Sequence, residues 1–457
     1  MVFERALVGK KILKNVYIEF DGIYIRRVEV VDFEPTVLGI AIPSFVDTHA
    51  HYISYSLSLT RPRLDGIDNI YDALEFIKEN VPKVKNDVVI MEGFDDSKWE
   101  RTITREDLDK ITDRPLILRR VCGHKAVLNS SAIRVLKERF GNIPNLNEET
   151  GLAVEDLPLS LSKYFPPTDE EVEQAILKAE ELLRGFGIIS VGENTSARYI
   201  KKLVEMDKSG ELKVKWRVAA YFRQLEEIKD FLDYESDNFR IVGLKEFLDG
   251  SVGAKTAAFS KGYTDGSNGK LLKSDEELEF MLKTAESLNL GVWWHAIGDL
   301  AIDQALRVLQ KSKNPENHRI EHFEFPRDEH YKTAANMGIK LSLQPNFVKR
   351  WGQLNGLYHK SLGDVFLWGN RFKYLESLGA NYAFGSDNMP PGPIYGLLGA
   401  LYHPLKEERL SLEEALYRYT TSGAKMLNDN DYGEIKMGKK AYITVITEEC
   451  LKDLSLL

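Results

Sequence analysis

The chain has 457 residues, of which 43% are hydrophobic and 29% charged, as in an ordinary soluble globular protein large enough for a catalytic domain and an accessory one. The net charge of −9 argues against a general affinity for nucleic acid or anionic membranes. Cys122 and Cys450 are the only cysteines, which excludes a disulfide framework and a thiolate zinc site. Because no bilayer-spanning apolar run or signal-peptide pattern is present, a cytoplasmic location is expected.

Both ends of the chain are rich in β-forming residues. Residues 16–33 read VYIEFDGIYIRRVEVVDF, in which Asp21-Gly22 is a strong hairpin signal, and residues 439–447 read KKAYITVIT. We expect residues 1–43 and 426–457 to form together a small β-sandwich-like domain.

Amphipathic helices follow the first β-rich segment. One begins after Thr168, where Glu171 completes a capping box, and apolar residues then recur at helical spacing until a glycine ends the pattern. The segments that begin at Ser274 and Ser411 repeat this design.

Short apolar strands alternate with these helices. The eight candidates are IPSFVDTHAH (42–51), IISVGEN (188–194), VKWRVAAYF (214–222), IVGLKEFLDG (241–250), GVWWHAIG (291–298), RIEHFEF (319–325), IKLSLQPN (339–346) and NYAFGSDN (381–388). This alternation predicts an α/β fold, a (β/α)8 TIM barrel over residues 44–425, with its chemistry at the C-terminal strand ends. Residues 60–165 are more than one crossover needs, and we interpret them as an insertion over the barrel mouth.

Polar residues interrupt these strands near their ends. His49 and His51 are two positions apart, so in a strand both imidazoles project from one face. Lys245 lies within the fourth strand and is costly to bury unless it is paired or modified. Taken singly, each residue has an ordinary structural explanation, and Asp387 could be a helix cap. The joint pattern favours a metal site, because five different strands each carry one such residue or pair. These are His49 with His51, Lys245, His295, His322 and Asp387.

This ordered set resembles the amidohydrolase superfamily of metal-dependent hydrolases, most closely its YtcJ-like branch of N-acyl amide and formamide hydrolases. The matching segments are FVDTHAH, GLKEFLDGSVGAKTA, HAIGDLAID, RIEH and FGSDNMP, with TREDLDKITDRPLILRRVCGHKAVLNSSA and GEIKMGKKA outside the strands. Two positions depart from the family pattern: Ala441-Tyr442-Ile443 replaces the usual Ala-Asp-Leu, and Glu193 stands where aspartate is commoner.

The resemblance implies a binuclear centre, most often of zinc. His49, His51 and Asp387 would bind one ion, and His295 and His322 the other. Lys245, carboxylated by CO2, would bridge the two ions, which turns a buried cation into an anionic oxygen ligand. Imidazole and carboxylate are ligand types that zinc accepts.

The implied reaction is hydrolysis of a non-peptide C–N bond in an amide, N-acyl compound or formamide. Two divalent ions about 3.5–4 Å apart can share a hydroxide and lower the pKa of its parent water to about 7. This metal-bridged hydroxide would attack the carbonyl carbon, and Asp387 would transfer the proton to the leaving amine.

Further residues are candidates for substrate binding. Arg120 and His124 match a segment of the branch that lines the pocket, with structural hydrogen bonding as the alternative. Lys255 could bind a substrate carboxylate, with a solvated surface lysine as the alternative. The remaining histidines fit no metal spacing and are expected at the surface: His318, His330, His359 and His403.

Other chemistries remain open at this stage. Lys245 could instead form a Schiff base, although that chemistry needs no set of histidines. A mononuclear deaminase keeps the histidines and the aspartate but usually lacks the lysine, and an esterase or lactonase could use the same barrel. A non-catalytic relative would typically have lost ligands. We expect a small-molecule substrate and no nucleic acid or membrane partner. A homodimer is possible, because it is the commonest oligomer of soluble proteins.

Overall fold

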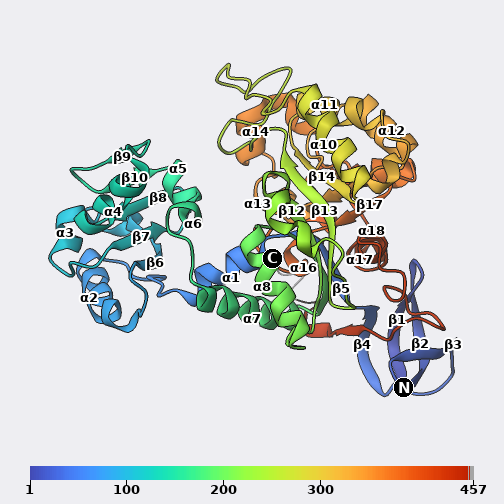
Figure 1. The fold of residues 1–457 in the computed structure, drawn as a ribbon. Helices are drawn as coiled ribbons and strands as arrows, with labels where there is room; N and C mark the ends of the chain where they lie inside the picture. The colour runs from blue at the N-terminus through green and yellow to red at the C-terminus, as the bar shows by residue number, and fades with distance from the viewer. Residues whose placement is uncertain (451, 453–457) are drawn as a thin grey trace. The chain divides into compact units, whose positions relative to one another are not determined.

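The computed structural model describes residues 1–450 and 452. Residues 451 and 453–457 of the expected C-terminal β segment (426–457) lie outside the described residues. The chain divides into two compact units (Figure 1). One, which we call the barrel unit, comprises Met1–Tyr52 and the chain from Glu180 onward, and the other, the inserted unit, comprises Ile53–Ala179. Among the described residues, no helix has both the length and the apolar character needed to cross a membrane.

The barrel unit is built on an eight-stranded parallel sheet, in agreement with the predicted TIM barrel. The strands, in their order across the sheet, are β5 (Phe45–Ala50), β11 (Ile188–Thr195), β12 (Lys215–Tyr221), β13 (Phe239–Phe247), β14 (Gly291–Ala296), β15 (Arg319–His322), β16 (Lys340–Leu343) and β17 (Tyr382–Phe384). All eight predicted strands are present. The sheet nearly closes because the Asp387 N–H, just beyond β17, donates to the His49 carbonyl in β5 at 2.8 Å.

Helices follow most of the barrel strands; α10 and α11 pack against β14, and α12 packs against α11 (Figure 1). The three predicted capping boxes are confirmed at Thr168, Ser274 and Ser411. The longer helices are α7 (Asp169–Gly185), α8 (Ala197–Lys208), α10 (Asp275–Ser287), α11 (Asp299–Leu309), α12 (Asp328–Met337), α16 (Pro393–Leu401) and α17 (Leu412–Tyr419). Shorter ones are α9 (Leu225–Ile228), α13 (Pro345–Arg350), α14 (Leu357–Leu362), α15 (Phe372–Ser377) and α18 (Thr421–Met426).

The two chain ends form one five-stranded sheet within the barrel unit. Its order is β18 (Ile443–Ile446), β4 (Val37–Pro43), β1 (Val2–Val8), β2 (Lys11–Asp21) and β3 (Tyr24–Val30). The predicted hairpin joins β2 to β3, and Gly22 adopts the positive φ of +59° that this tight turn requires. The described strands provide no second sheet here, so the expected sandwich is not confirmed.

The inserted unit has its own five-stranded sheet. Its strands are β6 (Val89–Phe94), β7 (Leu116–Arg120), β8 (Lys125–Leu128), β10 (Leu152–Val154) and β9 (Leu146–Asn147), in that order. Its helices are α2 (Ile70–Asn80), α3 (Arg105–Asp109), α4 (Ser130–Phe140), α5 (Asp156–Leu159) and α6 (Leu161–Tyr164), and α1 (Tyr52–Thr60) begins at the boundary. The placement of this unit over the barrel mouth stays a prediction.

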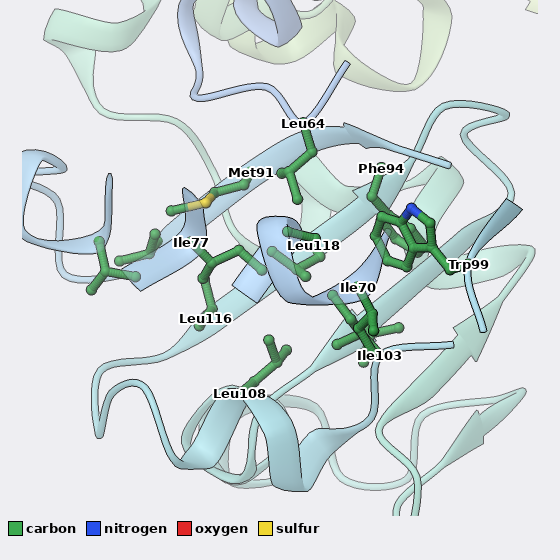
Figure 2. Close-up of a cluster of buried hydrophobic side chains, with 14 residues drawn as sticks. Leu64, Ile70, Ile77, Met91, Phe94, Trp99, Ile103, Leu108, Leu116 and Leu118 are labelled. Carbon is green, nitrogen blue, oxygen red and sulfur yellow. The ribbon is translucent and has the colours of Figure 1, made fainter. Parts of the chain in front are cut away.

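Strand alternation gives the inserted unit a core on each face of its sheet. Leu116 and Leu118 of β7 pack in the cluster of Figure 2, beside Trp99 and Ile70. Ile117, between them, packs in the opposite cluster. Because successive strand residues point to opposite faces, both faces of this sheet are covered.

Replacing Leu118 with alanine should destabilise the inserted unit by about 2–5 kcal/mol, because the side chain is fully buried and its removal leaves a cavity. Urea unfolding followed by tryptophan fluorescence measures this loss. The same measurement on a Trp99→Phe protein identifies the part of the signal that comes from Trp99, which packs in the same cluster. Val121→Ala is the control, since Val121 is 55% exposed and should change the free energy of unfolding by less than about 0.5 kcal/mol. An equal loss in both variants would contradict the burial of Leu118 in this core.

Candidate metal centre

The six side chains singled out in the sequence converge at the C-terminal ends of the barrel strands. The ring centroid of His322 lies 4.8 Å from that of His49 and 4.5 Å from that of His295. The Asp387 Oδ1 atom lies 3.4 Å from Nε2 of both His49 and His51. The sixth, Lys245, is fully buried and interacts electrostatically with Asp387 and the histidines.

These side chains suit a divalent cation. His49, His322 and Asp387 offer ligand atoms that all lie within 4.8 Å of one another. The Lys245 Nζ atom is buried and has no hydrogen-bond partner among the described residues, although an unpaired buried ammonium is costly. The imidazoles, a carboxylate and a buried lysine without a hydrogen-bond partner therefore fit a site completed by metal ions.

Hydrogen bonds fix which ring nitrogen of each histidine is free for a metal. The Nδ1 atoms of three rings are engaged: that of His49 by Glu321, that of His51 by the Asn194 carbonyl at 2.9 Å, and that of His322 by Gln344 Oε1 at 2.7 Å. Their Nε2 atoms remain available. His295 is reversed, since its Nε2 lies 3.0 Å from the Gly250 carbonyl and leaves Nδ1 available. Such second partners are typical of metal-binding histidines.

The loop after β17 is fastened to β5. Both Asp47 oxygens accept from Ser386, one from the backbone N–H at 2.8 Å and one from the hydroxyl at 2.6 Å. Asn388 Oδ1 accepts the backbone N–H of His51 at 2.6 Å. Gly385 lies so close to β5 that a Cβ would come within 2.4 Å of the His49 nitrogen. These contacts fix Asp387 beside the two histidines.

Burial keeps three of the four imidazoles neutral, which is the form that binds metal. It lowers the pKa of His51 to about 4 and that of His295 to about 3, and it lowers the pKa of His322 well below its usual value. Burial acts the same way on His49, but the Glu321 and Asp387 carboxylates together raise its pKa overall. Burial also lowers the pKa of Lys245 to about 8.

Asp387 is favoured in its ionised form. Burial alone would raise its pKa, but the hydrogen bond and charge of His49, together with His51 and Lys245, lower it overall. The site therefore holds a carboxylate that is able to accept a proton.

The candidate substrate-binding residues have other partners within their own units. Lys255 forms an ion pair with Asp265 at 2.5 Å on the surface of the barrel unit. In the inserted unit, the Arg120 guanidinium contacts Asp95 and Asp96, and His124 Nδ1 lies 3.0 Å from Glu155. Their contact with substrate stays a prediction.

The prediction of surface positions is wrong for His318, His330 and His403, which are 1–3% exposed. His318 Nδ1 accepts the Val292 N–H, and Arg327 donates to His330 Nε2 at 3.0 Å. The His318 bond joins positions 26 residues apart, which residue spacing does not reveal, whereas the bonds of His330 and of His403, to Leu405, are local.

Sequence reasoning also missed the residues that orient the centre. Glu321 contacts His49, Gln344 contacts His322, and Glu193 accepts the N–H of Tyr52, next to His51, at 2.7 Å. A signal was available at Glu321, since a carboxylate inside a buried strand requires a partner.

Comparison with known proteins agrees with this geometry. Residues 39–452 match the family model Amidohydro_3, described as the amidohydrolase family. YtcJ of Bacillus subtilis (strain 168), named as an amidohydrolase, is 27% identical over 90% of this chain and 84% of its own. LONG AFTER FAR-RED 3 of Arabidopsis thaliana is 24% identical over 91% of this chain and 80% of its own. The crystal structure of an uncharacterized metal-dependent hydrolase from Pyrococcus furiosus is 26% identical, with a TM-score of 0.85 over 98% of both chains.

The fold, the cluster of histidines and these matches define a class of protein, the metal-dependent hydrolases built on a TIM barrel. The chain belongs to the amidohydrolase family and resembles its YtcJ-like members. Its activity is accordingly hydrolysis that depends on a divalent metal.

Proposed function

We propose that this enzyme hydrolyses a non-peptide C–N bond of an amide, N-acyl compound or formamide, with two divalent cations, zinc in the first instance. The single observation that supports a binuclear centre best is Lys245, whose Nζ is buried without a hydrogen-bond partner among the described residues and interacts electrostatically with His49 and His295. Carboxylation of this amine would replace a buried cation without a hydrogen-bond partner by a group whose single negative charge is shared by two oxygens.

Each ligand would have a defined place. His49, His51 and Asp387 would bind one cation, His295 and His322 the other, and carboxylated Lys245 both. The free nitrogens identified above, Nε2 of three rings and Nδ1 of His295, are the atoms available for this role. Bound divalent cations would polarise the substrate carbonyl and lower the pKa of water.

Asp387 would move the proton. Its ionised carboxylate accepts a proton from the attacking water at Oδ1 or Oδ2 and then donates it to the departing nitrogen, which leaves as a neutral amine. The fixed backbone of the loop after β17 keeps the carboxylate beside His49 and His51 during both transfers.

Metal analysis of the purified protein should give two divalent ions per chain. Prolonged chelation should abolish hydrolysis in a screen of N-acyl and N-formyl compounds, and added Zn2+ should restore it. One ion per chain with deamination of heterocyclic amines would favour the mononuclear alternative. Ester or lactone hydrolysis without amide hydrolysis would contradict the proposed bond type, and metal-free turnover would contradict the proposal as a whole.

A further inference from the structure

Inside the barrel, an ion pair adjoins the candidate metal centre. Arg319 and Glu321 are two positions apart on β15, so both side chains project into the barrel interior. Arg319 is 1% exposed and Glu321 0%. The Arg319 Nε lies 2.5 Å from Glu321 Oε1, and Nη2 donates to Oε2 at 3.0 Å.

Two other strands hold the Arg319 guanidinium in place. Its Cζ lies 3.6 Å from the centroid of the Trp293 ring on β14, the strand position that pairs with Arg319 in the sheet. Its Nη2 also donates to the Thr48 carbonyl of β5. The side chain therefore reaches across the barrel from β15 to β5, the strand that carries His49.

Glu321 continues this connection to a candidate ligand. Its Oε2 atom contacts Nδ1 of His49, while Nε2 of the same ring faces Asp387. Arg319 thus reaches two consecutive residues of β5, the backbone of Thr48 directly and the ring of His49 through Glu321. A carboxylate partner on Nδ1 selects the tautomer that leaves Nε2 free and fixes the plane of the ring.

We propose that Arg319 is a positioning residue of the metal centre, acting through Glu321 on His49. An unpaired carboxylate at Glu321 would be costly in this interior, and arginine neutralises it with a planar fork that also stacks on Trp293. Lysine could supply the charge but could not contact Glu321, Thr48 and Trp293 at once. The proposal rests on the proposed function only in that His49 binds a metal ion.

The chain contains a matched control for a buried ion pair with no role at the centre. Arg217 on β12 is 2% exposed and donates to Asp429 through Nη2 at 2.8 Å, as tightly paired as Arg319. Its carboxylate partner contacts Arg240, Ser190 and Tyr432 and none of the six candidate metal-site side chains. If the Arg319–Glu321 pair only stabilised the fold, replacing either arginine would leave the metal affinity unchanged.

The test measures Zn2+ affinity by competition with a chromogenic chelator, on the folded fraction of each protein. Arg319→Met should weaken the affinity by about 10–100-fold, Glu321→Gln by about 10-fold, and Arg319→Lys by an intermediate factor. Arg217→Met should lower the melting temperature but keep the wild-type affinity. The absorption spectrum of the Co2+-loaded protein should change in the first three variants and not in Arg217→Met.

The outcomes separate the two proposals. If folded Arg319→Met and Glu321→Gln bind Zn2+ as the wild type does, the positioning role is overturned while the proposed function stands. If Arg319→Met does not fold, Glu321→Gln decides, because the amide is nearly isosteric but lacks the charge and has one acceptor oxygen fewer. If the folded wild type binds no Zn2+, Co2+ or Mn2+, the proposed function itself fails.

Discussion

Replacing Asp387 with asparagine is expected to lower kcat/KM by about 10²–10⁴-fold, the contribution typical of a general acid–base group. The amide keeps the size of the side chain and can still interact with His49 and His51, but it cannot accept a proton. Because the pKa of Asp387 is held low by these histidines and Lys245, the wild-type carboxylate is ionised and able to act at neutral pH.

The experiment determines kcat/KM and metal content of the same preparation, on the best substrate from the acyl and formyl screen. Asp364→Asn is the control, since this carboxylate is exposed on η6 (Gly363–Trp368). It should retain wild-type turnover. If Asp387→Asn keeps both metal ions and wild-type turnover, Asp387 does not carry the proton. If it loses the metals, addition of Zn2+ in excess separates binding from proton transfer.

The barrel and the convergence of its six polar side chains could be predicted from sequence because parallel strands expose their C-terminal ends at one edge. Each of the eight strands is a short apolar run, and a residue such as His295 or Asp387 at its end must meet the others there. The separation of these residues along the chain therefore does not matter, and their occurrence at one strand end after another is enough to predict that they converge.

The partners of those side chains were not predictable in the same way. Simple alternation would place Glu321 and His322 on opposite faces, yet both contact the centre because His322 adopts a φ of +69° at the strand end. The single terminal sheet, expected as a sandwich, likewise depends on how β18 pairs with β4. Backbone conformation and pairing of this kind depend on tertiary contacts that residue types alone do not encode.

Replacing Lys245 with methionine should lower the metal content of the protein and raise the stability of its metal-free form. The number of divalent ions per chain should fall from two to at most one, because methionine cannot be carboxylated. The chelator-treated, metal-free variant should be more stable than the metal-free wild type by roughly 2–4 kcal/mol at pH 7, because a buried, unpartnered ammonium is replaced by an apolar chain of similar length.

The dependence on pH identifies the cause of this gain. The pKa of Lys245 is about 8 in the folded protein and higher in the unfolded chain, so the unfolded state binds the proton more tightly. The cost of burying the ammonium is fully present below pH 8 and disappears as the pH rises toward 10.5. The difference in unfolding free energy between variant and wild type, measured by urea denaturation, should therefore shrink over that interval.

Arg217→Met is the control, and its effect on the free energy of unfolding should have the opposite sign. It removes a buried cation that has a carboxylate partner, so stability should fall. A Lys245→Met protein that retains two ions per chain would show that this side chain does not bridge them. A metal-free variant less stable than the wild type would show that Lys245 has a partner in solution. Opposed effects on stability and metal content would have one cause, a lysine kept for metal binding at a cost to the stability of the fold.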